Sequence, residues 1–133
     1  MVFSQPVEFK IEDVKFESEG VTLAASIVIP KEILAAVVIV HGSDPVKREM
    51  EFAKRLAKQG IAVLTYDKRG VGESGGIYVG PSVGTNNIDS GNLHLLSHDA
   101  NAAVKTFRKY LKNKKLPIGL VGFSQAEIGR AHV

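Results

Sequence analysis

The feature that most constrains this chain is an uninterrupted apolar run at positions 35–40, Ala-Ala-Val-Val-Ile-Val. A strand with one solvated face would instead alternate apolar and polar residues. The run therefore predicts a strand that is covered on both faces, as in a parallel sheet between two layers of helices. Similar short runs follow at 61–66 and 118–121. A segment with helical spacing precedes each of them, which predicts an α/β fold with crossover helices.

The two predicted helices cover residues 48–59 and 93–113. Gly60 follows the first helix and is expected to stop it. The second helix carries an apolar stripe at spacings of three and four residues. The stripe consists of Leu96, Ala100, Ala103, Val104, Phe107 and Leu111. The stretch 67–92, before the second helix, is rich in Gly, Ser and Asn and predicts a long loop.

The chain begins with a predicted antiparallel hairpin at one edge of the sheet. Residues 7–17 and 21–29 have the composition of strands, and Ser18-Glu19-Gly20 forms the turn between them. The apolar alternation of the first strand changes phase at Glu12-Asp13, which predicts a bulge there.

A candidate nucleophile follows the last predicted strand. The sequence Gly122-Phe123-Ser124-Gln125-Ala126 has the Gly-x-Ser-x-Gly/Ala form of a nucleophile elbow, which exposes a serine hydroxyl above the end of a sheet. The small residues at both ends of the motif leave room for the sharp turn. The alternative is a plain strand-to-helix turn in which Ser124 is the helix N-cap. These residues alone leave both interpretations open.

A second motif, His41-Gly42-Ser43, follows the first buried strand. Serine hydrolases place there the loop that donates one oxyanion-hole N–H, and the second donor is the N–H of Gln125, directly after the serine. His41 precedes the serine, whereas the catalytic histidine of this fold follows it. We therefore expect His41 to orient the loop through a backbone hydrogen bond and not to be the catalytic base.

A third motif, residues 66–74, contains two glycines after the strand 61–66. The first glycine lies several residues beyond the strand, and no Gly-x-Gly-x-x-Gly sequence opens a helix here. The chain also has no P-loop, so a nucleotide-binding or flavodoxin-like domain is disfavoured. We expect Asp67 and Arg69 to shape this loop through a local ion pair or turn hydrogen bonds.

The three motifs in this order resemble the α/β-hydrolase superfamily. More narrowly, the chain is similar over residues 7–126 to the bacterial group of S33-type serine aminopeptidases and esterases. The resemblance implies a serine hydrolase of carboxylic ester, thioester or peptide bonds that needs no metal or organic cofactor. It implies that Ser124 is the nucleophile and that the amides of Ser43 and Gln125 form the oxyanion hole. The substrate would be a small molecule or peptide with an acyl group.

The end of the chain affects this expectation. The family's acid and histidine follow the serine after later strands, and His132 is too close behind Ser124 to be that histidine. Residues 7–126 are thus expected to be the N-terminal portion of one α/β-hydrolase domain, with an incomplete sheet and no activity of its own. Residues 127–133 match the translation of a common sequencing-adapter sequence, so we expect them to be a non-native tail.

The composition excludes several other classes of protein. The chain has 133 residues, a formal net charge of +3 and no cysteine, which excludes disulfides and thiolate metal sites. Its positive charge forms no basic stripe, so no nucleic-acid partner is expected. No apolar run approaches the roughly 18–20 residues of a membrane span. The N-terminus lacks a complete signal peptide, although Val2-Phe3-Ser4 could end one, so both cytoplasmic and secreted locations stay open.

Two histidines in the second helix form the remaining candidate site. His94 and His98 are four residues apart and could share a metal ion, but no His-Glu-x-x-His motif accompanies them. We expect two solvent-side histidines and no metal site. The alternative to an enzyme is a non-catalytic α/β binding module with Ser124 as a helix cap.

Overall fold

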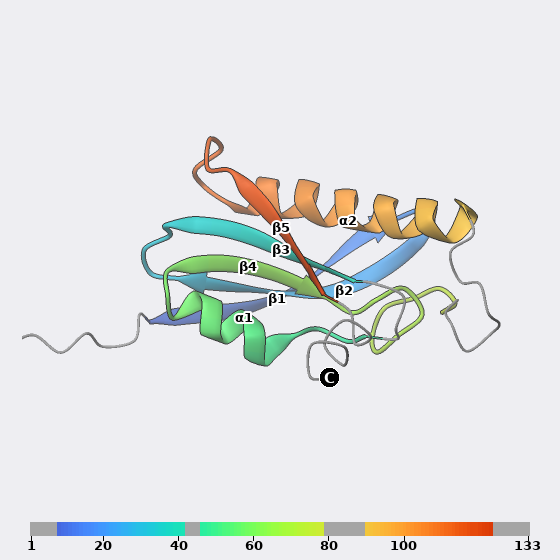
Figure 1. Ribbon diagram of the computed structural model, residues 1–133, viewed down its shortest axis with the longest axis horizontal. Coiled ribbons are helices and arrows are strands. Elements are labelled where there is room, and N and C mark those ends of the chain that lie inside the picture. Colours follow the sequence, from blue (N-terminus) through green and yellow to red (C-terminus); the bar gives the residue numbers. More distant parts are fainter. Residues whose placement is uncertain (1–7, 42–45, 79–89, 124–133) are drawn as a thin grey trace, which may run out of the picture.

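The computed structural model describes residues 8–41, 46–78 and 90–123, which form a mixed sheet and two helices (Figure 1). The strands are β1 (Phe9–Ser18), β2 (Val21–Pro30), β3 (Ala35–His41), β4 (Ile61–Tyr66) and β5 (Ile118–Phe123). The helices are α1 (Met50–Ala57) and α2 (Ser90–Tyr110). The strand order across the sheet is β1-β2-β4-β3-β5.

The sheet combines an antiparallel hairpin with a parallel half. β1 pairs with β2, and β2 with β4, in antiparallel fashion. β3 lies between β4 and β5 and is parallel to both. The prediction of a leading hairpin at the sheet edge followed by parallel strands with crossover helices is confirmed.

The helices cover opposite faces of the sheet, with α2 on one side and α1 on the other (Figure 1). Successive side chains of a strand point to opposite faces, so the central strands contribute to both cores. In β3, Val38 lies in the core under α2 and Ile39 in the core under α1. In β4, Leu64 lies in the core under α2 and Val63 lies in the core under α1. This double coverage explains the uninterrupted apolar runs in the sequence.

The helix boundaries differ from those expected. The helix α2 begins at Ser90 and buries Ala103 and Phe107 against the sheet, and Leu111 is buried just after the helix ends. The helix α1 begins at Met50, two residues later than predicted, because Glu49 has a non-helical backbone with φ of −91° and ψ of 68°. The N–H of Arg48 donates to Asp67 Oδ1 and that of Glu49 to Thr65 Oγ1, both at 2.8 Å. In the described part of the chain, neither helix is both long and apolar enough to cross a membrane.

The predicted bulge in β1 is wrong. The register between β1 and β2 runs without interruption from Phe9↔Pro30 to Ser18↔Val21. The change of phase in the sequence instead marks a change in the face that is buried. Phe9 packs on the α1 side, whereas Val14 and Phe16 pack on the α2 side. The strand makes this switch without an extra residue because its successive side chains point to opposite faces of the sheet.

Candidate active site

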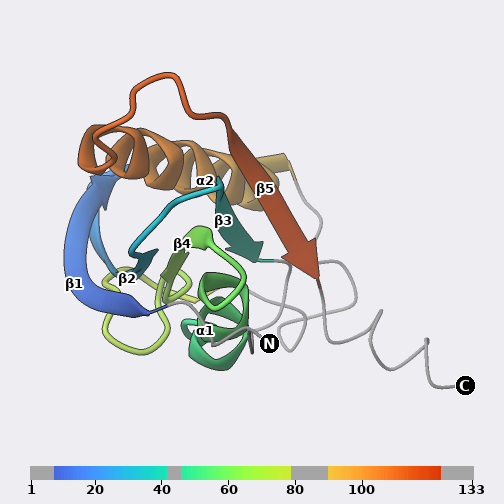
Figure 2. The same cartoon turned by 90° about the vertical axis from the view of Figure 1, so that its left-hand side faces the viewer.

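The carboxyl ends of the three parallel strands meet at one edge of the sheet (Figure 2). His41, the last residue of β3, is in register with Phe123, the last residue of β5. On the other side of β3, Ile39 is in register with Thr65 of β4. Open α/β sheets bind their ligands outside this edge, which makes it the candidate active-site region.

His41 makes a backbone hydrogen bond to the neighbouring strand. Its Nε2 lies within hydrogen-bonding distance of the carbonyl oxygen of Tyr66, and the two rings meet edge-on with centroids 4.6 Å apart. A carbonyl oxygen can only accept a hydrogen bond, so Nε2 carries the proton. In the neutral ring, Nδ1 then carries no proton. Burial lowers the pKa of His41 below its ordinary value of 6.5, which keeps the imidazole neutral at neutral pH.

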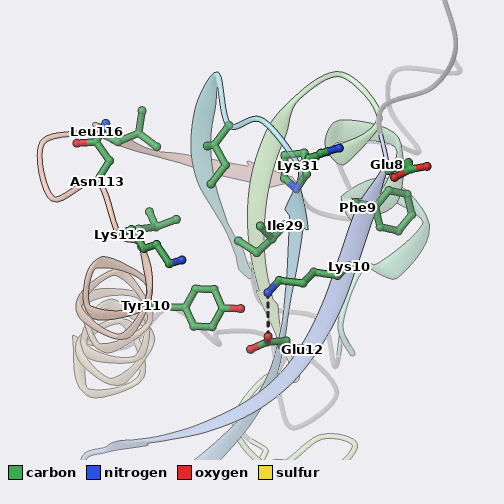
Figure 3. Close-up of a pocket in the computed structure, with 13 residues that line it drawn as sticks. Glu8, Phe9, Lys10, Glu12, Ile29, Lys31, Tyr110, Lys112, Asn113 and Leu116 are labelled. Carbon is green, nitrogen blue, oxygen red and sulfur yellow. Dashed lines mark ion pairs between the residues drawn. The ribbon is translucent and has the colours of Figure 1, made fainter.

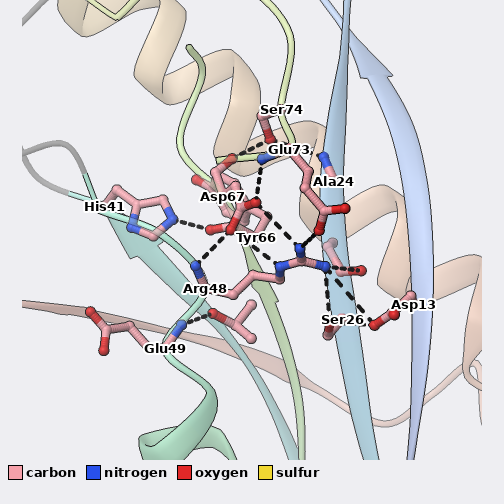
Figure 4. Close-up of polar contacts among 12 residues, drawn as sticks. Asp13, Ala24, Ser26, His41, Arg48, Glu49, Tyr66, Asp67, Glu73 and Ser74 are labelled. Carbon is pink, nitrogen blue, oxygen red and sulfur yellow. Dashed lines mark hydrogen bonds and ion pairs between the residues drawn. The ribbon is translucent and has the colours of Figure 1, made fainter. Parts of the chain in front are cut away.

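Asp67, the residue after β4, organises the loop that follows (Figure 4). Asp67 is 2% exposed, and its carboxylate accepts hydrogen bonds from two segments of the chain. Oδ1 accepts from the backbone N–H and Nε of Arg48, at 2.8 and 3.2 Å, and Oδ2 accepts from the N–H of Glu73 at 2.8 Å. Arg48 also forms an ion pair with Glu73. The carboxylate thus joins the segment before α1 to the loop after β4.

Ser74 fastens the far end of the same loop to β2. Its hydroxyl donates to the Asp67 carbonyl oxygen at 2.6 Å and accepts from the Ala24 N–H at 2.9 Å. The Asp67 N–H in turn donates to the Ala24 carbonyl oxygen at 2.8 Å. Ser74 therefore closes the turn and satisfies a backbone N–H of β2 that would otherwise be buried without a partner.

Arg69 belongs to a second buried network. Its Nε and Nη2 contact the two oxygens of Asp99 in α2, at 3.0 and 2.8 Å. Nη2 also donates to the Ser18 carbonyl oxygen at 2.9 Å, and the Ser18 hydroxyl donates to Asp99 Oδ1 at 2.6 Å. A bidentate pair of this kind fixes the relative orientation of the two side chains and also stabilises their charges. Asp67 and Arg69, which could have formed a local ion pair, instead bind separate partners.

Arg48 pairs with Asp67 and Asp99 pairs with Arg69, and neither partner was predicted from the sequence. One signal for Asp99 was available. It lies three residues after Leu96 and four before Ala103, within the apolar stripe of α2. A charged residue at a core-facing position predicts a buried partner.

The remaining predicted site residues, Gly42, Ser43, Ser124 and Gln125, lie outside the described residues. Their catalytic roles, and the influence of His41 on the loop that follows it, stay predictions.

A cavity of about 790 Å³ lies away from this edge (Figure 3). It is bounded by the start of β1, the end of β2 and the end of α2, near the amino ends of the parallel strands. Inside it, burial and a hydrogen bond with Glu12 raise the pKa of Tyr110 to about 12. Lys10 pairs with the same carboxylate at 3.3 Å. Because the candidate active site lies at the carboxyl ends of these strands, the cavity is separate from it.

The loop after β4 yields a first prediction, for Gly72→Ala. Gly72 has φ of +57°, and a Cβ there would lie 2.5 Å from Asp67 Oδ2. The left-handed backbone disfavours alanine by roughly 1–2 kcal/mol, and the methyl group must also displace a buried carboxylate. We expect a loss of about 2–4 kcal/mol in the free energy of unfolding, measured by urea denaturation.

Gly20→Ala is the matched control, because Gly20 has φ of +78° but open space around the added methyl group. This variant should lose only the roughly 1–2 kcal/mol that a left-handed backbone costs alanine. Equal losses in the two variants would contradict the role given to the contact with Asp67.

His41 yields a prediction on pH dependence. Because its pKa is lowered on folding, the unfolded chain binds a proton below pH 6.5 that the folded chain does not. The His41 contribution should therefore reduce stability as the pH falls below 6.5, by up to about 1.4 kcal/mol per pH unit, and should leave stability unchanged above it. Urea denaturation of the protein and of His41→Gln at about pH 7.5 and 5.5 measures this. The pH dependence should be weaker in the variant, and identical dependence would refute the prediction.

Comparison with known proteins places these features in a family. The family model described as "Serine aminopeptidase, S33" matches residues 31–125. An esterase from Pyrococcus furiosus is 29% identical, with a TM-score of 0.61 over 86% of this chain and 41% of its own. A hypothetical protein from Pseudomonas aeruginosa is 27% identical, with a TM-score of 0.63 over 89% of this chain and 36% of its own.

A third structure, Est1E from Butyrivibrio proteoclasticus with bound ferulic acid, is 22% identical and supports the fold alone. Its TM-score is 0.60, over 89% of this chain and 48% of its own. The chain thus spans less than half the length of each of these three proteins. No curated protein matches it. The family match over most of the chain, together with the shared fold, shows that the chain belongs to the serine aminopeptidase (S33) family of α/β hydrolases.

Proposed function

We propose that the protein is a serine hydrolase of small carboxylic esters and that Ser124 is its nucleophile. The observation that carries the proposal is the register between β3 and β5, which pairs His41 with Phe123. Gly42-Ser43 follows the first of these residues directly, and Ser124-Gln125 follows the second. Adjacent parallel strands lie about 4.8 Å apart, so two segments that leave them at the same edge begin side by side.

The close packing of these strands supports the proposal. A Cβ on Gly122 would lie 3.0 Å from the Val40 Cγ2 methyl group of β3, which is tighter than ordinary contact. Glycine at the first position of the serine motif therefore lets β5 approach β3 at the point where both strands end. The nucleophile-elbow interpretation also requires a small residue at this position, for the sharp turn at the serine.

In the proposed reaction, the Ser124 hydroxyl attacks the ester carbonyl and gives its proton to a histidine. The histidine returns this proton to the leaving alkoxide, and loss of the alcohol gives an acyl-enzyme. The N–H groups of Ser43 and Gln125 would stabilise the oxyanion, each contributing on the order of 3 kcal/mol. Water then hydrolyses the acyl-enzyme by the same steps. We assign His41 a positioning role, since its Nε2 proton is already donated to Tyr66.

The catalytic histidine and acid would come from residues that follow Ser124 in a longer protein. The 133-residue chain has one histidine after Ser124, His132, only eight positions later. We therefore propose that residues 7–126 form the N-terminal portion of the hydrolase domain and that the 133-residue chain alone has no turnover. Without a base, a serine hydroxyl is a weak nucleophile at neutral pH.

Esters are the favoured substrates because the Pyrococcus furiosus relative is an esterase. The family description names an aminopeptidase, which makes peptide bonds the second candidate. Hydrolysis rates on p-nitrophenyl esters and on aminoacyl p-nitroanilides distinguish the two. We expect the protein encoded by the complete reading frame to prefer the esters, and a preference for the anilides would reverse the assignment.

Ser124→Ala tests the nucleophile in the protein expressed from the complete reading frame. We expect a loss on the order of 10⁶-fold in kcat, because removal of the serine eliminates the acyl-enzyme route. A fluorophosphonate should label the unmodified protein once, at Ser124, as judged by peptide mass spectrometry.

Ser97→Ala is the control, since Ser97 is exposed on α2. It should keep both the activity and the label. If the unmodified protein takes no label and hydrolyses no ester, Ser124 is a helix cap and the protein is a binding module. Activity in Ser124→Ala equal to that of the control would show that Ser124 is not the nucleophile.

A further inference from the structure

A cluster of metal-ligating side chains lies apart from the residues assigned to ester hydrolysis. It consists of Glu19, in the turn of the β1–β2 hairpin, with His94 and His98 in the first turns of α2. One ligand atom from each of the three residues lies within 4.8 Å of the other two. We propose that these residues form a binding site for a divalent transition-metal ion of the zinc type.

The two histidines are arranged as a chelating pair. Residues four apart lie on the same face of a helix, and the His94 and His98 rings have centroids 4.2 Å apart. The sequence pattern shows this pair but not a third ligand, because Glu19 lies in a distant segment of the chain.

The third ligand comes from the hairpin. Glu19 Oε1 lies 3.0 Å from His98 Nδ1. Glu19 has φ of +45°, a left-handed conformation that is unusual for a residue other than glycine, and Gly20 continues the turn with φ of +78°. This two-residue turn with both φ values positive is the rigid form that joins hairpin strands. The turn therefore holds Glu19 beside α2.

Buried contacts fix both halves of the cluster. Ser18 immediately precedes Glu19, and Asp99 immediately follows His98. The Ser18 hydroxyl donates to Asp99 at 2.6 Å, and Arg69 binds both residues. Ligands attached to a rigid framework lose little freedom when an ion binds, which favours affinity.

The donor set indicates which ion would bind. Two imidazoles and one carboxylate suit zinc and neighbouring transition metals, whereas magnesium and calcium prefer oxygen ligands only. At zinc–ligand distances of about 2.0–2.2 Å, neighbouring ligand atoms in a tetrahedral site lie roughly 3.3–3.5 Å apart. The three ligand atoms, which all lie within 4.8 Å of one another, would have to move closer by at most about 1.5 Å. The Glu19 and His98 side chains are 41% and 44% exposed, so an ion can enter from solvent.

Calorimetric titration with ZnCl₂ tests the site, with tag-free protein from the complete reading frame in chelator-free buffer. We expect binding of one ion per chain. His94→Ala and Glu19→Gln should each weaken it by about 100-fold or more, because even loss of an outer partner weakens metal binding by about 10–100-fold. Glu51→Gln removes a carboxylate from α1, on the other face of the sheet, and should leave the affinity unchanged.

Thermal unfolding gives a second readout that does not depend on hydrolytic activity. Zinc at about 100 times its Kd should raise the Tm by roughly 5–10 °C, and EDTA should reverse the rise. Magnesium at the same concentration should have no effect. Failure of the unmodified protein to bind zinc, or equal binding by Glu19→Gln, His94→Ala and Glu51→Gln, would overturn the proposal and leave only a contact between Glu19 and His98.

Discussion

The parallel pairing of β3 with β4 on one side and β5 on the other is the constraint on which the candidate site depends. It brings the ends of three strands to one edge and sets His41 beside Phe123. This arrangement requires strands that are apolar on both faces, because α1 and α2 cover the two sides of the sheet. The core and the candidate site therefore depend on the same feature of the sequence.

Two buried carboxylates hold the loops around this edge. Asp67 joins the loop after β4 to Arg48 before α1, and Asp99 joins the same loop, through Arg69, to the hairpin. A buried charge is tolerated only when it is paired and hydrogen-bonded, so each network favours one arrangement of its loop. The Asp99 network also lies directly beside Glu19 and His98, where it supports the proposed metal site.

Much of the fold could be predicted from the sequence, because periodicity reports directly on burial. The run at 35–40 and the stripe through Phe107 correctly indicated a doubly covered strand and the helix that covers it. The phase change at Glu12-Asp13 was misinterpreted as a bulge, because a change of buried face and an inserted residue leave the same pattern in the sequence.

The polar contacts were less predictable. Arg48 and Asp67 are 19 positions apart, and Ser18 and Asp99 are 81 apart, so only the folded chain brings them together. Glu19 escaped notice as a ligand for the same reason. The serine motif was recognisable because its residues are contiguous, but contiguity says nothing about the groups that must surround it.

The most direct measurement of the central claim is a crystal structure of the protein from the complete reading frame after reaction with a phosphonate ester. The account predicts phosphorus bonded to Ser124 Oγ, with a phosphonate oxygen about 2.7–3.1 Å from the backbone nitrogens of both Ser43 and Gln125. Phosphorus on a different residue, or a phosphonate oxygen that neither of these amides contacts, would contradict it.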